Sequence, residues 1–273
     1  MRELPGGWYD MTPAAPGTPA GPYALLFPFA GGNIHSMREW IAELGPGWRP
    51  LVAQYPLRGR RQRIPMPASL TELAAELADM FMDFAPGERP LLLGHSLGAH
   101  LAHAAAVRLE ERGVAPRLLV AAASRTADGT VRPGEVPLHR RSDPDLIEAL
   151  GLDGTVPEAL ADRRFAELFL PVIRADLRLG HDHLATGYAR TVRCPVLAVG
   201  GTEDPLAGPD DVSAWSRTAA GDFALELVPG GHFFQQAGGT GLRGHFDRAL
   251  TDTRRRHPVP AAPYPHDDSG DAR

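Results

Sequence analysis

The sequence predicts an α/β fold in which helices flank a mainly parallel sheet. Apolar runs of strand length recur along the chain, and helical patterns separate most of them. This alternation is typical of strand–helix–strand units, whose buried strands read as nearly continuous apolar runs. The expected strands are Tyr23–Phe27, Pro50–Gln54, Pro90–Leu93, Arg117–Ala122, Pro195–Val199 and Phe223–Val228.

The connecting helices have clear signals in two places. The segment 70–84 places apolar residues at i, i+3 and i+4, and Ser69 can cap it with Glu72 three residues on. About seventy residues separate the strand ending near Ala123 from the one starting at Pro195, which is too long for a simple crossover. We expect an inserted helical lid over about 125–190, with extra packing helices as the alternative.

The lid region contains two helical patterns. In the first, Asp143 is a plausible N-cap, Pro144 the first helical residue and Gly151 the stop. The second is amphipathic, and Pro171 is expected to kink it. Its expected apolar stripe is Phe165, Leu168, Phe169, Val172 and Ile173.

Composition limits the class of protein. A chain of 273 residues with 43% hydrophobic residues can bury one sizeable core, so we expect one domain. A net charge of −5 gives no basic footprint for nucleic acid, and no apolar run approaches the length of a membrane span. The lone Cys194 cannot form an internal disulfide, and no secretory signal begins the chain. We expect a cytoplasmic monomer that binds neither nucleic acid nor membrane.

The two ends differ from the centre in composition. Residues 5–22 carry five prolines among glycines and alanines, a mixture unsuited to a helix or a sheet ladder. Residues 254–273 are again rich in proline and then polar. We therefore expect a flexible N-terminal arm over 1–22, a folded domain over 23–253 and a disordered tail over 254–273.

The most informative motif is the G-x-S-x-G turn centred on Ser96. It lies between an apolar strand and a helical segment that stops at Gly113, which is the context of a nucleophile elbow in an α/β-hydrolase fold. Gly94 and Gly98 remove side chains that would collide around a strained turn. Ser96 is the candidate nucleophile, and the N–H of Leu97 at the helix start is a candidate oxyanion donor.

The fold's chain order places the acid and then the histidine after the serine. His232 follows the last expected strand, behind two glycines that permit a tight loop. Asp204 follows the preceding strand and is the candidate acid that orients the imidazole. Its rivals are Glu203, Asp210 and Asp211.

The remaining candidates are weaker. The loop after the first core strand contains Ala30-Gly31-Gly32, and the Ala30 N–H is the second expected oxyanion donor. We assign His95 a structural role and expect the two histidines of the following helix, at positions 100 and 103, to be packed or solvated. His181 and His183 do not share a helical face, so we expect no metal, and nothing indicates another cofactor.

Six segments in order resemble the type II thioesterases of polyketide synthase and nonribosomal peptide synthetase systems. The resemblance covers about residues 24–250. It implies that the protein hydrolyses stalled or wrongly primed acyl groups from the phosphopantetheine arm of a carrier protein, its expected partner, and that the lid is mobile. The segments are 27–32, 54–56 with Arg58 and Arg61, 94–99, 170–176, 201–205 and 229–234.

Two positions depart from the family pattern. The family often has His or Tyr where Phe29 stands, and Gly where Leu57 stands. These changes predict an altered acyl pocket or entrance but remove no catalytic group, because Ala30 is expected to act through its backbone.

Two other functions stay open. One is a general carboxylester hydrolase, since fold does not fix substrate. The other is an inactive hydrolase-like module that only binds a synthase. A further hypothesis concerns a basic loop that could steer an acidic carrier protein or could simply be solvated. Its residues are Arg58, Arg60, Arg61 and Arg63.

Overall fold

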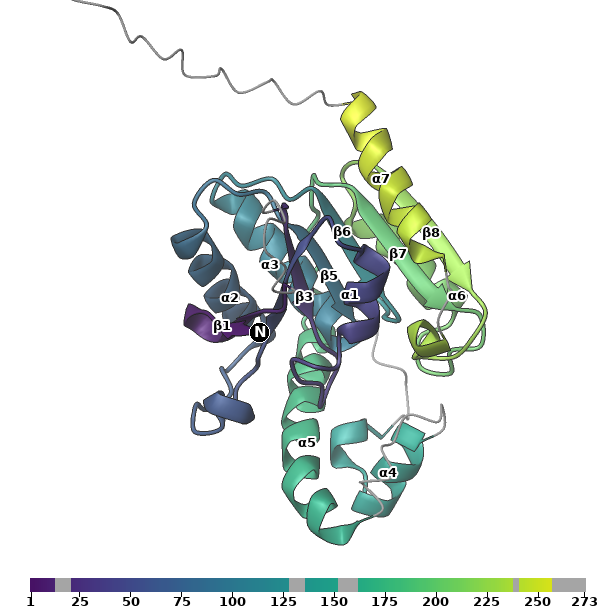
Figure 1. Ribbon diagram of the computed structural model, residues 1–273. Coiled ribbons are helices and arrows are strands. Elements are labelled where there is room, and N and C mark those ends of the chain that lie inside the picture. The colour runs from purple at the N-terminus through teal and green to yellow at the C-terminus, as the bar shows by residue number, and fades with distance from the viewer. Residues whose placement is uncertain (13–20, 128–135, 152–161, 238–240, 257–273) are drawn as a thin grey trace, which may run out of the picture.

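The computed structural model describes residues 1–12, 21–127, 136–151, 162–237 and 241–256. Within them an eight-stranded sheet has the order β1-β2-β4-β3-β5-β6-β7-β8 (Figure 1). Strands β3 to β8 are all parallel to one another, while β1 and β2 are antiparallel to their neighbours. Their bounds are Arg2–Glu3, Trp8–Asp10, Tyr23–Phe27, Arg49–Ala53, Leu91–His95, Leu118–Ala122, Val196–Gly201 and Phe223–Val228, from β1 to β8.

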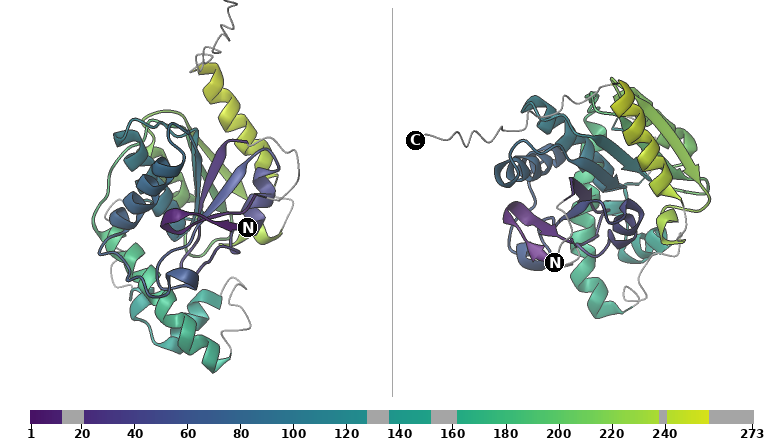
Figure 2. Two further views of the ribbon diagram at one scale, coloured as in Figure 1. Left: turned by 60° about the vertical axis from the view of Figure 1, so that its left-hand side comes forward. Right: turned by 45° about the horizontal axis from the view of Figure 1, so that its top comes forward.

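Helices cover both faces of the sheet. On one face α2 (Leu70–Phe84) packs beside α3 (Leu97–Glu111), and on the other α1 (Arg38–Leu44) lies near α7 (Leu242–Arg256), as the two views of Figure 2 also show. The short α6 (Pro209–Ser213) follows β7. None of the described helices combines the length and apolar character needed to span a membrane.

Alternation along the strands divides the core into two layers. Leu25, Leu92 and Leu119 pack on the side of α2 and α3. Their chain neighbours Leu26 and Leu93 pack on the side of α1 and α7. Successive strand residues point to opposite faces, so strands that read as continuous apolar runs supply both layers. The predicted α/β class and the six expected strands are confirmed, with ends that differ by one or two residues.

The predicted helix 70–84 is also confirmed. It begins at Leu70 because the Ser69 side chain accepts a hydrogen bond from the Glu72 N–H, at 3.1 Å. Its inward positions, among them Leu73 and Leu77, are buried against the sheet and α3.

The N-terminal segment was expected to be loose, and this expectation is wrong for residues 2–10. Trp8–Asp10 pairs with β4, and the fully buried Trp8 ring donates from Nε1 to the Leu77 carbonyl, at 3.0 Å. Gly6 and Gly7 have φ of 71° and 86°, so they reverse the chain and make a hairpin with β1. A three-residue strand is too short to register as an apolar run. Residues 13–20 lie outside the described range.

The inserted segment contributes α4 (Asp143–Gly151) and α5 (Arg163–Ala185), which lie together beyond one end of the sheet (Figure 1). The cap of α4 lies one residue earlier than expected, because the Ser142 hydroxyl accepts the Asp145 N–H. The expected stripe of α5 is partly wrong, since Leu168 is 72% exposed. The buried positions are Ala166, Leu170, Ile173, Asp176, Leu179, Gly180 and His183.

The C-terminal boundary also differs from the expectation. Helix α7 extends to Arg256, so the helical pattern continues past the expected tail start at residue 254. Residues 257–273 lie outside the described range. The division of the chain into arm, domain and tail otherwise stays a prediction.

Candidate active site

Ser96 lies at the sharp turn between β5 and α3. Its backbone has φ 54° and ψ −118°, a conformation that L residues rarely adopt. A Cβ on Gly94 would lie 2.0 Å from the Gly98 carbonyl oxygen, and one on Gly98 would lie 1.9 Å from the Phe27 oxygen. The two glycines are therefore required by close backbone packing, and the turn holds Ser96 at the carboxyl end of the sheet.

Asp204 and His232 meet at the carboxyl ends of the neighbouring strands β7 and β8. Asp204 Oδ2 lies 2.8 Å from His232 Nδ1, and both side chains are buried. Asp204 Oδ1 accepts the N–H groups of Leu206 and Ala207, at 2.8 and 3.1 Å. One carboxylate oxygen is thus fixed by backbone while the other faces the imidazole, which favours the tautomer with its proton on Nδ1.

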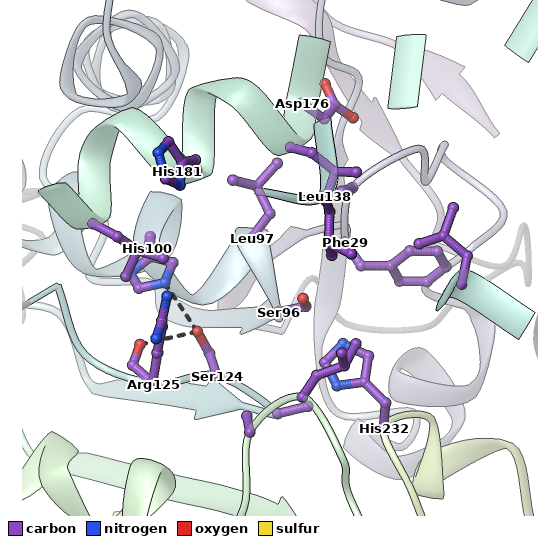
Figure 3. A pocket seen from close by; sticks show the side chains of 18 of the residues that line it. Phe29, Ser96, Leu97, His100, Ser124, Arg125, Leu138, Asp176, His181 and His232 are labelled. Atoms are coloured by element: carbon purple, nitrogen blue, oxygen red, sulfur yellow. Dashed lines mark hydrogen bonds between the residues drawn. The ribbon is translucent and has the colours of Figure 1, made fainter. Parts of the chain in front are cut away.

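Ser96 and His232 line one cavity of about 250 Å³. Figure 3 shows both side chains at its edge, with His100 and His181 on the far side. Its walls come from the loops after β3, β6, β7 and β8, from the serine turn and the start of α3, and from the inserted segment with α4 and α5. Helix α5 supplies Asp176, Leu177, Gly180, His181 and Leu184. The inserted segment therefore forms one side of the cavity that holds the candidate nucleophile.

The two expected oxyanion donors also border this cavity. Ala30 lies in a turn closed by the Gly32 N–H and the Phe29 carbonyl at 2.9 Å, with φ of 78° at Gly31. A positive φ at the third turn residue is typical of a type II turn, whose second residue has no N–H bond within the turn. Leu97 is the first residue of α3, where the N–H has no partner within the helix.

Some aromatic and histidine side chains line the cavity, and others pack behind it. Phe29 packs edge-on against Phe233, with ring centroids 4.8 Å apart, so the position that departs from the family pattern does line the pocket. His95 is fully buried and stacks on Phe233; burial, followed by the charge of His232, lowers its pKa well below the usual value. His95 therefore packs behind the site, as expected.

His100 lines the cavity, although we expected it to be only packed or solvated. Its Nε2 lies 3.0 Å from the Ser124 hydroxyl, and burial is the main cause that lowers its pKa well below the usual range. The residue could have been noticed because it lies one turn after Ser96 on the same helix. Across the cavity His139 and His181 have ring centroids 5.0 Å apart.

Within the described residues, no group of three or more His, Cys, Asp or Glu side chains is arranged to hold a metal ion.

The hypothesis of a basic docking loop is wrong for two of its four arginines. Arg58 is buried and pairs with Asp176, and Arg61 is buried and pairs with Glu76. Only Arg60 and Arg63 remain exposed, and Arg60 pairs with Glu3. The buried arginines stabilise the loop after β4, where Leu57 has φ of 66° in a conformation that favours glycine.

Asp176 is a site residue whose role the sequence did not predict. It is fully buried, and burial raises its pKa although Arg58 and the Gly31 N–H oppose the shift. A signal was present, because Asp176 follows Ile173 by three residues and so continues the inward face of α5.

The fold, the strained serine turn and the buried Asp–His pair define a hydrolase of the α/β class. The thioesterase domain family matches residues 24–250. The chain is 32% identical over 88% of its length to the probable cadicidin biosynthesis thioesterase of Streptomyces griseus, and spans 63% of that relative. It is 34% identical to thioesterase PikA5 of Streptomyces venezuelae, over 77% of this chain and 74% of the relative.

The comparison with solved structures leads to the same family. The type II thioesterase BorB from the borrelidin biosynthetic cluster aligns with a TM-score of 0.75 and 28% identity, over 92% of this chain and 100% of BorB. The chain belongs to the thioesterase domain family. The resemblance inferred from the six segments is thereby confirmed, and the enzyme class is that of hydrolases acting on thioesters.

Proposed function

We propose that the protein hydrolyses acyl thioesters carried on the phosphopantetheine arm of a carrier protein, through a triad of Ser96, His232 and Asp204. The observation that carries the proposal is the buried 2.8 Å contact of Asp204 with His232, beside the cavity that Ser96 also lines. A buried acid that fixes the imidazole tautomer is what a serine nucleophile requires of its base.

The proposed reaction has two steps. His232 Nε2 takes the proton of Ser96 Oγ as this oxygen attacks the thioester carbonyl, and the N–H groups of Ala30 and Leu97 stabilise the oxyanion. The C–S bond breaks, the thiol leaves with the proton and an acyl-serine remains. Water then adds to the acyl-serine with His232 as base, releasing the acid and restoring Ser96.

Thioester chemistry suits these residues. A thiol has a pKa of about 8.5, so its anion is a good leaving group and needs little protonation. Most of the required stabilisation therefore falls on the oxyanion donors. The mainly apolar cavity wall, with Leu97, Leu138 and Leu177 among its members, suits an acyl chain.

A role in removing aberrant acyl groups is the finer part of the proposal. Two similar proteins, the cadicidin thioesterase and BorB, are named for biosynthetic systems, and BorB is titled a type II thioesterase. We therefore propose a polyketide or nonribosomal peptide synthase carrier as the partner. A cytoplasmic location and a monomeric state remain predictions.

The test compares three substrates with one acyl group: the acyl-loaded carrier protein, the acyl-pantetheine thioester and the matching ethyl ester. We expect the carrier-bound thioester to have the highest kcat/KM, and Ser96→Ala to abolish its hydrolysis. A strong preference for the ethyl ester would instead indicate a carboxylester hydrolase. No turnover of any substrate, with carrier binding retained, would indicate a binding module.

A further inference from the structure

A buried ion pair lies directly behind the oxyanion loop, defined here as residues 28–32. Arg58, on the loop after β4, and Asp176, on α5, have their Nη2 and Oδ1 atoms 2.5 Å apart, with the side chains 8% and 0% exposed. Neither residue belongs to the proposed triad. The pair joins two segments separated by 118 positions in the sequence.

Both members of the pair also bind the backbone of the oxyanion loop. Asp176 Oδ2 accepts the Gly31 N–H at 2.8 Å, and Arg58 Nη1 donates to the Gly32 carbonyl at 2.7 Å. Arg58 Nε additionally donates to the Pro56 carbonyl at 3.1 Å, which fixes the guanidinium plane. The carboxylate and the guanidinium therefore hold two consecutive residues of the loop from one side.

A second contact fixes the start of the same loop. The buried Tyr55 hydroxyl donates to the Pro28 carbonyl at 2.8 Å, and the Arg58 guanidinium lies 5.2 Å from the Tyr55 ring centroid. Between these anchors the Ala30 N–H is the group expected to bind the oxyanion. The Ala30 N–H lies in the Phe29–Ala30 peptide plane, and the carbonyl of that peptide accepts the Gly32 N–H at 2.9 Å. The anchored residues Gly31 and Gly32 therefore fix its direction.

Helix α5 approaches the loop closely at this point. A Cβ on Gly31 would lie 2.6 Å from Ile173 Cγ1, so glycine is needed both for space and for its φ of 78°. Ile173 and Asp176 are one turn apart on α5, and both contact Gly31. The position of α5 and the geometry of the oxyanion loop are thus mechanically linked.

We propose that Asp176 and Arg58 are positioning residues that keep the Ala30 N–H directed into the cavity, so that helix α5 must be seated for the oxyanion hole to be complete. The inference rests on the proposed function, because it assigns these residues to the same hydrolysis. A donor preorganised toward the developing charge stabilises the transition state without affecting ground-state binding equally.

The test replaces the pair with apolar residues, Arg58→Met with Asp176→Leu, because such replacements of buried ion pairs commonly keep the fold. We expect kcat for an acyl-pantetheine thioester to fall about 10- to 100-fold, with KM little changed. Affinity for a trifluoromethyl ketone analogue, whose serine adduct carries an oxyanion, should fall in parallel. Titration of reactive serine with a fluorophosphonate corrects kcat for the folded fraction.

Two further variants test whether the loss of kcat comes from the contact with the oxyanion loop. Asp176→Asn keeps the shape and one oxygen that can accept the Gly31 N–H, so it should recover part of the lost kcat. Its amide leaves the buried Arg58 charge unpaired, so this variant should be less stable than the wild type. The control is Glu76→Gln, which removes the acidic partner of the second buried arginine, Arg61. Glu76 does not contact the oxyanion loop, so the kcat of this variant should equal that of the wild type. If the double replacement does not fold, kcat and ketone affinity of Asp176→Asn are compared instead, per reactive serine counted with the fluorophosphonate.

The outcomes separate the inference from the proposed function. If the wild type hydrolyses the thioester and Ser96→Ala does not, but the folded Asp176 variants retain the wild-type kcat and ketone affinity, the positioning role is overturned. If kcat and ketone affinity fall together, it is supported. If the wild type itself does not hydrolyse thioesters, the proposed function fails, while the ketone affinities still report on the loop.

Discussion

At the scale of single residues, the geometry around Ser96 depends on two glycines that leave room for close backbone packing. Gly94 and Gly98 let the end of β5, the start of α3 and the end of β3 approach within backbone contact. This approach brings the Leu97 N–H and the loop containing Ala30 to the same cavity. The serine turn and the oxyanion loop are therefore one packing unit.

Replacing Gly98 with alanine should disrupt this unit. The new Cβ would meet the Phe27 and Pro28 carbonyl oxygens, at 1.9 and 2.7 Å, and backbone cannot yield as a flexible side chain can. We expect a loss of about 3 kcal/mol in the free energy of unfolding, together with loss of activity. Chemical denaturation would measure the first. Gly47→Ala is the matched control, since its Cβ would meet nothing within 4 Å; equal stability losses in the two variants would contradict the argument.

Sequence patterns were sufficient to identify Ser96, Asp204 and His232 as candidates, because each follows an apolar strand and the chain order is fixed by the fold. They could not identify Asp176 or Arg58 as partners. The two lie 118 positions apart, and nothing local shows that α5 folds back onto the loop after β4. For the same reason Arg58 was read as part of an exposed basic loop.

At the scale of elements, the interface of α3 with α5 is where buried histidines gather. His100 and His103 of α3 lie near His183 of α5, and the rings of His100 and His183 are 5.4 Å apart. Burial lowers the pKa of His103 and of His183 to about 4. Both imidazoles are therefore neutral at pH 7, because burial disfavours their charged form.

The pH dependence of stability follows from these shifts. A histidine whose pKa is lower in the folded state binds its proton more tightly when unfolded, so stability falls as the pH drops from 6.5 toward 4. Each such histidine contributes a slope of up to about 1.4 kcal/mol per pH unit in that window. His103→Gln keeps a donor for the Arg190 carbonyl, 3.0 Å from His103 Nε2, and should flatten the slope measured by denaturation at several pH values. An unchanged slope would contradict the assignment.

At the scale of the whole molecule, the N-terminal hairpin extends the sheet beyond what the sequence predicted. Trp8 packs edge-on against Phe27 of β3, at 5.5 Å between ring centroids, and bonds to Leu77 of α2. Proline and glycine around the hairpin suggested a loose arm. Long-range pairing with β4 overrides that local preference, and such pairing leaves no signal in the composition of the segment.

Removing this contact should destabilise the entire fold. For Trp8→Ala we expect a loss of about 3–5 kcal/mol in the free energy of unfolding, because a fully buried ring leaves a cavity. Trp48→Ala, at a partly buried tryptophan, is the control and should cost less. Thermal and denaturant unfolding would measure both. A Trp8→Ala protein as stable as the wild type would mean that the hairpin is not part of the cooperative unit.

We expect the acyl group to pass from the carrier protein to Ser96 before water releases it. The protein is mixed with an acyl-loaded carrier protein, and the reaction is quenched within the first turnover. After digestion, mass spectrometry measures the mass of the peptide that contains residues 94–98. We expect a mass increase equal to the acyl group on Ser96 and no such increase in Ser96→Ala. An adduct on another residue, or undiminished hydrolysis by Ser96→Ala, would contradict it.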